Sequence, residues 1–156
     1  MRPLSIPVIV LLFFVSACVP SKKSTQATPS NSSRNLKKSP VEKLDEQTFK
    51  LTSVSDDPSY GYSEKNPIKV GGVNNSEGPL NERRFLNALL GPDNQLIKYR
   101  RLGSCCPFDT PNGLMGGGLL DRYEITYEGL EKPIVLYINM YDYDMLMAPK
   151  GFTFKK

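Results

Sequence analysis

The chain of 156 residues contains no histidine and only three cysteines. Because histidine is the commonest general base and metal ligand, its absence excludes Ser-His-Asp and Cys-His catalysis and disfavours a zinc site. We therefore expect no metal and no cofactor. The formal net charge is only +4, and the basic residues do not gather on one periodic face. We accordingly expect no nucleic acid among the partners.

The sequence also lacks an apolar run long enough to cross a membrane. Its longest such stretch covers residues 8–15, with Arg2 as the only charge before it. A transmembrane helix needs about twenty apolar residues, whereas a shorter run that ends in small residues is typical of a secretory signal. The pattern predicts a signal peptide over residues 1–17.

A cysteine directly follows the small residues, in Val15-Ser16-Ala17-Cys18. This stretch resembles the lipobox of bacterial lipoproteins, in which the cysteine is lipidated and the segment before it is removed. We expect Cys18 to anchor the mature chain to a membrane through its acyl chains, without a spanning segment. In such lipoproteins an aspartate after the cysteine often causes inner-membrane retention. Val19 stands there instead, which favours a cell-envelope location on the outer membrane, facing the periplasm. The alternative is a plain signal with an incidental cysteine.

Composition divides the mature chain into two parts. Residues 18–44 start at the lipidated cysteine, and within residues 20–40 only Ala27 and Leu36 are apolar. So polar a segment cannot bury enough surface to offset the entropy of ordering, and we predict a flexible tether. Residues 45–156 match the commonest domain size and contain no internal repeat or second linker. We expect a single globular domain there.

The helix signal in this domain is local and amphipathic. Leu86 and Leu89 fall at helical spacing, Glu82 and Arg84 occupy the polar side, and Gly91 supplies the end of the helix. This pattern predicts one helix that continues through residues 89–90 and packs on a sheet.

Alternation of apolar and polar residues predicts the strands. They are expected over residues 48–53, 68–70, 96–102, 119–127 and 134–140, with a short terminal strand over 152–154. The five-residue connection at 129–133 predicts an antiparallel hairpin between the last two long strands. The expected fold class is α+β, with a mostly antiparallel sheet and one packed helix.

Two adjacent cysteines, Cys105 and Cys106, lie in a predicted glycine-rich loop over residues 103–118. In the oxidising periplasm they can pair within one chain only with each other. Adjacent Cα atoms lie about 3.8 Å apart, below the usual minimum of about 4.4 Å, so a vicinal disulfide would be strained and easily reduced. Three interpretations stay open: buried structural thiols, a structural vicinal disulfide, and a redox or soft-metal role.

A second candidate site is a stripe of tyrosines. Tyr137, Tyr141 and Tyr143 alternate with the inward-facing residues of the last long strand, and should share a face with Arg122. Amphipathic rings among polar groups can contact a glycan, a peptidoglycan peptide or a protein. The alternative is that another segment covers this face or that the rings cap the sheet edge. We interpret the acidic pair Asp142 and Asp144, beside them, as a solvated edge rather than a calcium site, which needs six or more oxygen ligands.

Several runs in the folded part resemble one family. They are YGYSEKNPIKVGG at residues 60–72, NERRFLN at 81–87, LGSCCPF at 102–108 and YINMYD at 137–142. The chain thereby resembles small bacterial envelope lipoproteins without an established activity, over nearly the whole folded domain. Members are sometimes labelled 2-dehydro-3-deoxyphosphooctonate aldolase, which implies a (β/α)₈ barrel of about 250 residues. Residues 45–156 are too few for that barrel, and no catalytic residue matches, so none is assigned.

Two functional hypotheses follow. The first is a membrane-anchored lipoprotein whose periplasm-facing domain is a non-catalytic binding or structural module, with an envelope protein or a glycan as partner. Its contact surface would be the tyrosine face or the loop at residues 103–118. The alternative is a thiol-redox or enzymatic domain centred on Cys105 and Cys106. We favour the first, because no base or cofactor motif accompanies the cysteines.

Overall fold

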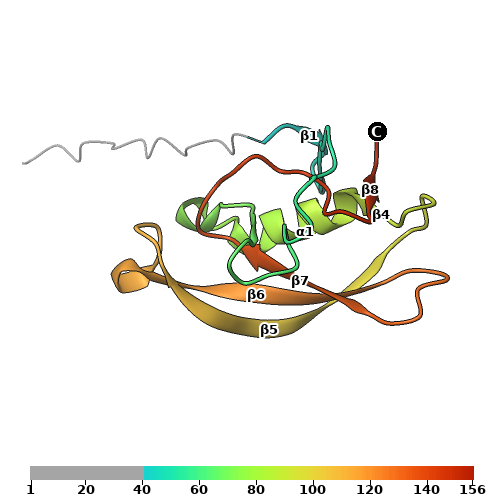
Figure 1. Ribbon diagram of the computed structural model, residues 1–156. Helices are drawn as coiled ribbons and strands as arrows, with labels where there is room; N and C mark the ends of the chain where they lie inside the picture. The colour runs from blue at the N-terminus through green and yellow to red at the C-terminus, as the bar shows by residue number, and fades with distance from the viewer. Residues whose placement is uncertain (1–40) are drawn as a thin grey trace, which may run out of the picture. The chain divides into compact units, whose positions relative to one another are not determined.

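The computed structural model describes residues 41–156 (Figure 1). The predicted signal peptide, Cys18 and nearly all of the predicted tether lie outside the described residues. Within residues 41–156, no helix is both long and apolar enough to cross a membrane.

A four-stranded sheet and one helix form most of the domain. The sheet consists of β3 (Ile68–Lys69), β7 (Ile134–Asn139), β6 (Gly117–Thr126) and β5 (Lys98–Asp109), in that order. The pair β3–β7 is parallel, and the pairs β7–β6 and β6–β5 are antiparallel. Helix α1 (Gly78–Ala88) lies across one face of the sheet (Figure 1). The domain is therefore α+β, as the sequence predicts.

Short elements complete the domain. Strand β1 (Lys43–Asp45) pairs with β2 (Thr48–Phe49), β4 (Leu89–Leu90) pairs with β8 (Thr153–Phe154), and two 3₁₀ helices, η1 (Val73–Asn75) and η2 (Leu114–Gly116), lie between longer elements. The strand predicted over residues 48–53 is wrong beyond Phe49. The chain leaves the ladder there, and Val54 forms an isolated bridge with Ala148 instead.

The helix also ends earlier than its periodicity predicts. Leu89 and Leu90 leave the helix in extended conformation and pair with β8. Lys155 N donates to the carbonyl of Ala88, which satisfies one of the last carbonyls of α1. The prediction of helix through residue 90 is wrong, because apolar side chains at helical spacing cannot reveal a strand partner more than sixty residues away.

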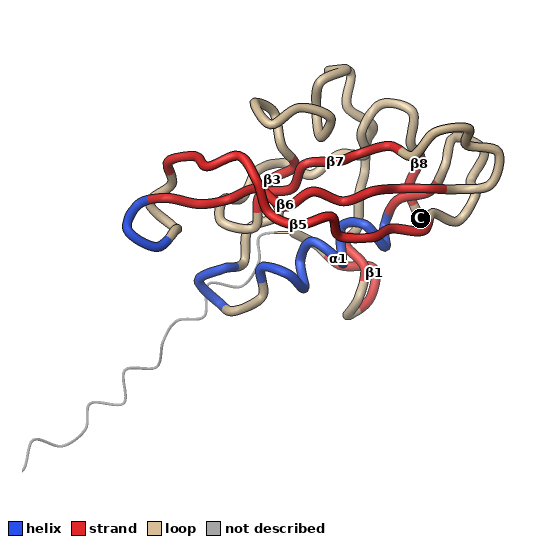
Figure 2. Tube along the Cα trace, turned by 90° about the horizontal axis from the view of Figure 1, so that it is seen from below, coloured by secondary structure: helices blue, strands red, loops and turns tan. Residues whose placement is uncertain are grey.

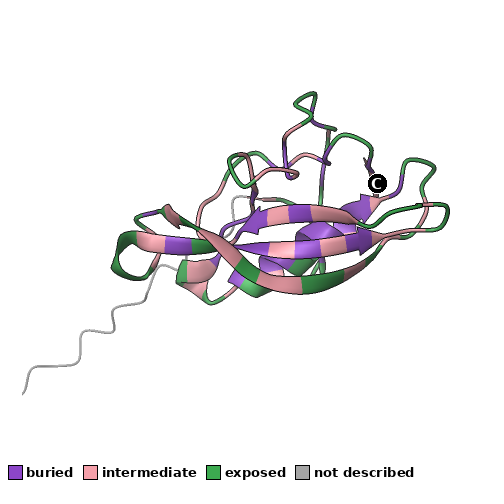
Figure 3. Cartoon of the chain, turned by 60° about the horizontal axis from the view of Figure 1, so that its bottom comes forward, coloured by how far each residue is buried: buried purple, intermediate pink, exposed green. Residues whose placement is uncertain are grey.

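The core lies between α1 and the sheet. Phe85 and Leu86 of α1 are fully buried together with Leu136 and Ile138 of β7. Buried and half-buried residues alternate over residues 121–126 of β6 and 135–138 of β7 (Figure 3), as expected for strands covered on one face. Tyr123 pairs with Leu136 in the β6–β7 ladder, and this ladder confirms the predicted hairpin.

Strand β5 is longer than predicted and forms one edge of the four-stranded sheet (Figure 2). It pairs with β6 as far as Asp109, so the loop predicted over residues 103–118 shrinks to residues 110–116. Two bulges interrupt the pairing, one between Arg101 and Gly103 and one between Cys105 and Pro107. Bulges accommodate glycine and positive φ inside a strand, which is why this segment looks like a loop in sequence.

Candidate functional site

A groove with a volume of about 720 Å³ lies at the closed end of the β5–β6 hairpin, which projects beyond α1 (Figure 1). We call it the hairpin groove. Its apolar lining consists of Val73, Pro107, Phe108, Leu114, Leu119 and Tyr141, and its polar lining includes Asp109 and Asn112. Segments from η1, β5, β6 and the end of β7 therefore meet at this groove.

A glycine on β6 makes room for the aromatic side chains of the groove. A Cβ at Gly118 would lie 2.9 Å from Phe108 Cζ and 3.0 Å from Tyr141 Cδ2. The two rings contact each other edge to face, with their centroids 5.8 Å apart. They consequently pack over a strand position that has no side chain of its own, and this glycine permits their close approach.

The loop at residues 110–116 presents apolar side chains at the rim of the groove. Thr110 N donates to the carbonyl of Gly116 at 2.9 Å, and a Cβ on Gly113 would overlap the carbonyl oxygen of Gly117. At the tip, Leu114 is 87% exposed and Met115 is 98% exposed. The loop is thus tightly closed while two large apolar side chains face solvent.

Asp142 ties this loop to the end of β7. Its carboxylate accepts hydrogen bonds from Thr110 Oγ1 at 2.6 Å, Asn112 Nδ2 at 3.0 Å and Asn139 Nδ2 at 2.9 Å. Partial burial raises the pKa of Asp142, but these hydrogen bonds and the charge of Lys69 outweigh it, so the pKa lies below its ordinary value. The prediction of a solvated edge is wrong for Asp142, because its carboxylate is hydrogen-bonded to two segments, and is confirmed for Asp144, whose side chain is 62% exposed.

Only one of the three predicted tyrosines reaches the hairpin groove. Tyr137 lies on β7 directly opposite Arg122 of β6, so the two share a face of the sheet as the sequence predicts. Strand β7 ends at Asn139, whose side-chain oxygen accepts from the backbone N–H of Tyr141 at 2.8 Å and turns the chain. Tyr141 therefore lies beyond the strand and contacts Phe108.

Tyr143 belongs to another part of the domain. It forms an isolated bridge with Val70, and a Cβ on Gly71 would lie 2.5 Å from atoms of the tyrosine ring. Its hydroxyl is buried and has no hydrogen-bond partner among residues 41–156. The close packing explains the glycine at position 71, since a side chain there would displace the ring, whereas a Cβ on Gly72 would overlap Asn81 Nδ2.

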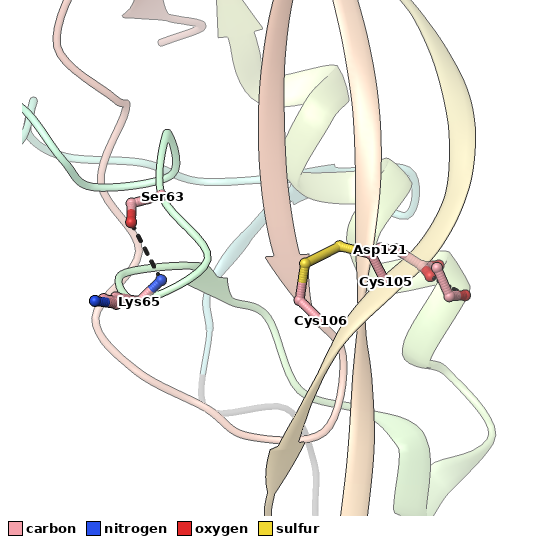
Figure 4. The surroundings of a disulfide bond; sticks show 6 residues. Ser63, Lys65, Cys105, Cys106 and Asp121 are labelled. Carbon is pink, nitrogen blue, oxygen red and sulfur yellow. Dashed lines mark hydrogen bonds between the residues drawn. A yellow bond between two sulfur atoms is a disulfide. The ribbon is translucent and has the colours of Figure 1, made fainter.

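The sulfur atoms of Cys105 and Cys106 are bonded to each other (Figure 4). Cys105 lies opposite Leu120 and Pro107 lies opposite Leu119, so Cys106 is the extra residue of the second β5 bulge. Its φ of 55° is in the left-handed region, which residues other than glycine adopt rarely. The next residues along β5, Pro107 and Phe108, line the hairpin groove. The disulfide thus lies where β5 enters the groove.

A cluster of polar side chains, separate from the hairpin groove, is centred on two buried carboxyl groups between α1 and the sheet. Glu82, which the sequence places on the polar side of the helix, is fully buried and accepts a 2.9 Å hydrogen bond from Tyr123. Asp121 accepts two 2.7 Å hydrogen bonds from Arg101 and one from Ser104. Burial and, next, the charge of Asp121 raise the pKa of Glu82 to about 8. The predicted exposure of Glu82 is wrong. Its buried carboxyl accepts a hydrogen bond from Tyr123, and its raised pKa favours the uncharged, protonated form, which costs less to bury than a carboxylate.

The groove also contains Leu119, which lies outside every predicted contact surface, and the prediction for the loop at 103–118 does not distinguish Phe108 and Leu114 from their neighbours. The available signal was the apolar pair Leu114-Met115 between glycines, where a loop would normally be polar. Among the described residues, no three side chains of cysteine, aspartate or glutamate gather as metal ligands.

Comparison of the chain with protein-family models, with curated proteins and with solved structures gives no match. The resemblance to envelope lipoproteins therefore stays a prediction.

Proposed function

We propose that the protein is a lipid-anchored lipoprotein of the bacterial cell envelope whose periplasm-facing domain is a non-catalytic binding module. The hairpin groove is its contact surface. The observation that carries the proposal is the near-complete exposure of Leu114 and Met115 beside an apolar groove. Apolar side chains that gather at the rim of a hollow are typical of interaction sites, because a partner removes them from water.

The chemistry of the lining favours a protein partner. Its apolar side chains suit the apolar side chains of another protein, and Asp109 places an exposed negative charge beside them. No lysine or arginine is among the groove's lining residues in the described part of the chain. An anionic glycan or lipid headgroup would lack a counter-charge here, whereas a protein that presents a basic residue next to apolar ones is complementary.

The lipid anchor at Cys18 fits a contact surface of this modest size. A small groove by itself supports weak or transient binding. Attachment of both partners to one membrane raises their effective concentration, and the encounter then needs less intrinsic affinity. The anchor and the groove therefore have complementary roles in this proposal.

Site-specific photo-crosslinking in intact cells tests the contact surface. A photoreactive amino acid is placed at Leu114 or Met115 of the full-length chain. Matched controls carry it at Leu96 or Met145, which are 74% and 72% exposed and lie outside the groove. We expect one identified envelope protein to be crosslinked from positions 114 and 115 only.

The crosslinking outcomes test both the contact surface and the class of partner. An Asp109→Lys substitution in the crosslinking chain should weaken the product if the partner presents a basic residue. Equal products from all four positions, or no product from any, would contradict the groove as contact surface. A carbohydrate or lipid adduct at 114 and 115 would replace the protein partner by that class of ligand.

The anchor is tested separately with an alkyne-labelled fatty acid fed to the cells. The native chain should take up the label and fractionate with membranes, and a Cys18→Ala chain should do neither. Label retained by Cys18→Ala would overturn the lipidation site.

A further inference from the structure

We propose that the Cys105–Cys106 disulfide is a redox-sensitive lock on the hairpin groove. The bond holds the second bulge of β5, and its reduction lets the strand rearrange and separates Phe108 from Tyr141. The inference rests on the proposed function of the groove, because it concerns the regulation of the same surface.

The first step concerns the backbone at the bulge. Cys106 has no pairing partner on β6 and adopts a φ of 55°. A side chain makes this conformation unfavourable in a free chain. A bond between neighbouring cysteines closes a small covalent ring around the peptide that joins them, and this ring restricts the backbone. Reduction opens the ring and removes the restriction.

The second step carries the change from the bulge to the groove. Phe108 pairs opposite Gly118 and shares its face with Tyr141. Successive side chains of a strand point to opposite faces of the sheet. If the bulge straightens and Cys106 pairs with β6, the register of the following residues shifts by one, and each of their side chains moves to the other face. Phe108 would then leave Tyr141, and Thr110 would lose its hydrogen bond to Asp142.

The thiol chemistry requires an external dithiol as reductant. One thiolate of the dithiol attacks a sulfur of the bridge, the Cys105–Cys106 bond breaks, and a mixed disulfide forms as the other cysteine leaves as thiolate. The second thiolate of the dithiol displaces the remaining cysteine and closes its own disulfide. The cysteine pair gains two electrons and takes up two protons from water, and the dithiol is oxidised. Both cysteines are only half-buried, so a small dithiol can reach them.

Hydrogen–deuterium exchange of the mature lipidated chain in vesicles tests the lock directly. The chain is compared before and after treatment with dithiothreitol. We expect amide exchange over residues 107–119 to rise roughly tenfold or more on reduction, because the local opening equilibrium shifts. The β6–β7 pairing over residues 134–138 should stay protected and shows that the domain remains folded. Unchanged exchange over residues 107–119 in the fully reduced chain would overturn the proposal.

Two variants separate the bond from the backbone conformation that it maintains. Cys105→Ala/Cys106→Gly has no thiols, but glycine accepts a positive φ without penalty. Its amide exchange over residues 107–119 should match that of the oxidised native chain and should not change when dithiothreitol is added. Cys105→Ser/Cys106→Ser should resemble the reduced chain. A serine variant as protected as the oxidised native chain would show that the bond does not hold the bulge.

Crosslinking from Met115 in both redox states distinguishes this inference from the proposed function. Loss of the product on reduction, together with faster exchange, supports regulation of the groove. A product that persists after reduction would overturn the regulation and leave the contact surface in place. Faster exchange in a chain that crosslinks to nothing would overturn the contact surface and leave the lock.

Discussion

Glu82 of α1 is fully buried near Asp121 of β6, and burial together with the charge of Asp121 raises its pKa to about 8. Asp121 is ionised: burial raises its pKa, but hydrogen bonds from Arg101 and Ser104 outweigh burial and lower it. With this raised pKa Glu82 holds its proton at pH 7, and a protonated carboxyl can donate a hydrogen bond to Asp121. Without such a proton, Glu82 Oε1 has no hydrogen-bond partner among the described residues.

This pair predicts a dependence of stability on pH. The pKa of Glu82 is about 8 in the folded chain against an ordinary 4.5, so the folded state holds a proton that the unfolded state loses between these values. The contribution of Glu82 to the free energy of unfolding should therefore be greatest below pH 4.5. Between pH 4.5 and pH 8 it should fall by up to about 1.4 kcal/mol per pH unit, and above pH 8 it should level off. Urea unfolding at pH 5, 6.5 and 8.5 measures the slope.

A Glu82→Gln variant should remove most of this slope, because an amide can donate to Asp121 and accept from Tyr123 without a proton to lose. The control is Glu46→Gln, whose side chain is 87% exposed and which should leave the slope unchanged. A slope that is equal in native and Glu82→Gln chains would contradict the raised pKa of Glu82 in the folded chain.

Two buried tyrosine hydroxyls should respond differently to removal. Tyr143→Phe deletes a buried hydroxyl without a hydrogen-bond partner in residues 41–156, so the free energy of unfolding should stay within about 0.5 kcal/mol or rise. Tyr123→Phe deletes the donor to Glu82 and should lower the free energy of unfolding by about 1–2 kcal/mol. Chemical denaturation at pH 6.5 compares the two variants. A larger loss of stability for Tyr143→Phe would refute the conclusion that only the Tyr123 hydroxyl forms a stabilising hydrogen bond.

The fold could be predicted where its signals are local. Tyr123 and Ile125 alternate with polar residues and give the β6 face directly, and the short connection to β7 gives the hairpin. The path of β5 could not be predicted in the same way. Gly103 and the run Cys105-Cys106-Pro107 are turn residues in most contexts, and only pairing with β6 makes them bulges of an edge strand.

The hairpin groove could be predicted only in part, for a related reason. Tyr141 and the glycine-rich loop were recognisable as candidate contact residues. The link between them could not be recognised, because Asp142 accepts from Thr110 and Asn112, about thirty residues earlier in the chain. A carboxylate with distant donors has the same local sequence pattern as a solvated one.

Neighbouring glycines on β6 should differ sharply in their tolerance of a methyl group. An added Cβ at Gly118 meets Phe108 at 2.9 Å and Thr110 at 3.0 Å, whereas at Gly117 the nearest atom is 3.9 Å away. Gly118→Ala should lower the free energy of unfolding by about 1–3 kcal/mol and weaken crosslinking from Met115. Gly117→Ala should change stability by less than about 0.5 kcal/mol. Equal effects would show that the aromatic rings do not pack on Gly118.

Asp142 and Asp144 provide the last comparison, between a carboxylate that organises the groove and one that does not. Asp142→Asn replaces an acceptor of three side-chain hydrogen bonds by a group with one acceptor oxygen, and should lower the free energy of unfolding by about 1–3 kcal/mol. Asp144→Asn removes only a 3.5 Å ion pair between Lys69 and a side chain that is 62% exposed, and should cost less than about 1 kcal/mol.

Because Asp142 joins the loop at residues 110–116 to the end of β7, its substitution should also accelerate amide exchange across that loop and reduce crosslinking from Leu114. Asp144→Asn should leave both unchanged. A loop that exchanges at the native rate in Asp142→Asn would mean that Gly113 and the Thr110 backbone hold it closed without the carboxylate.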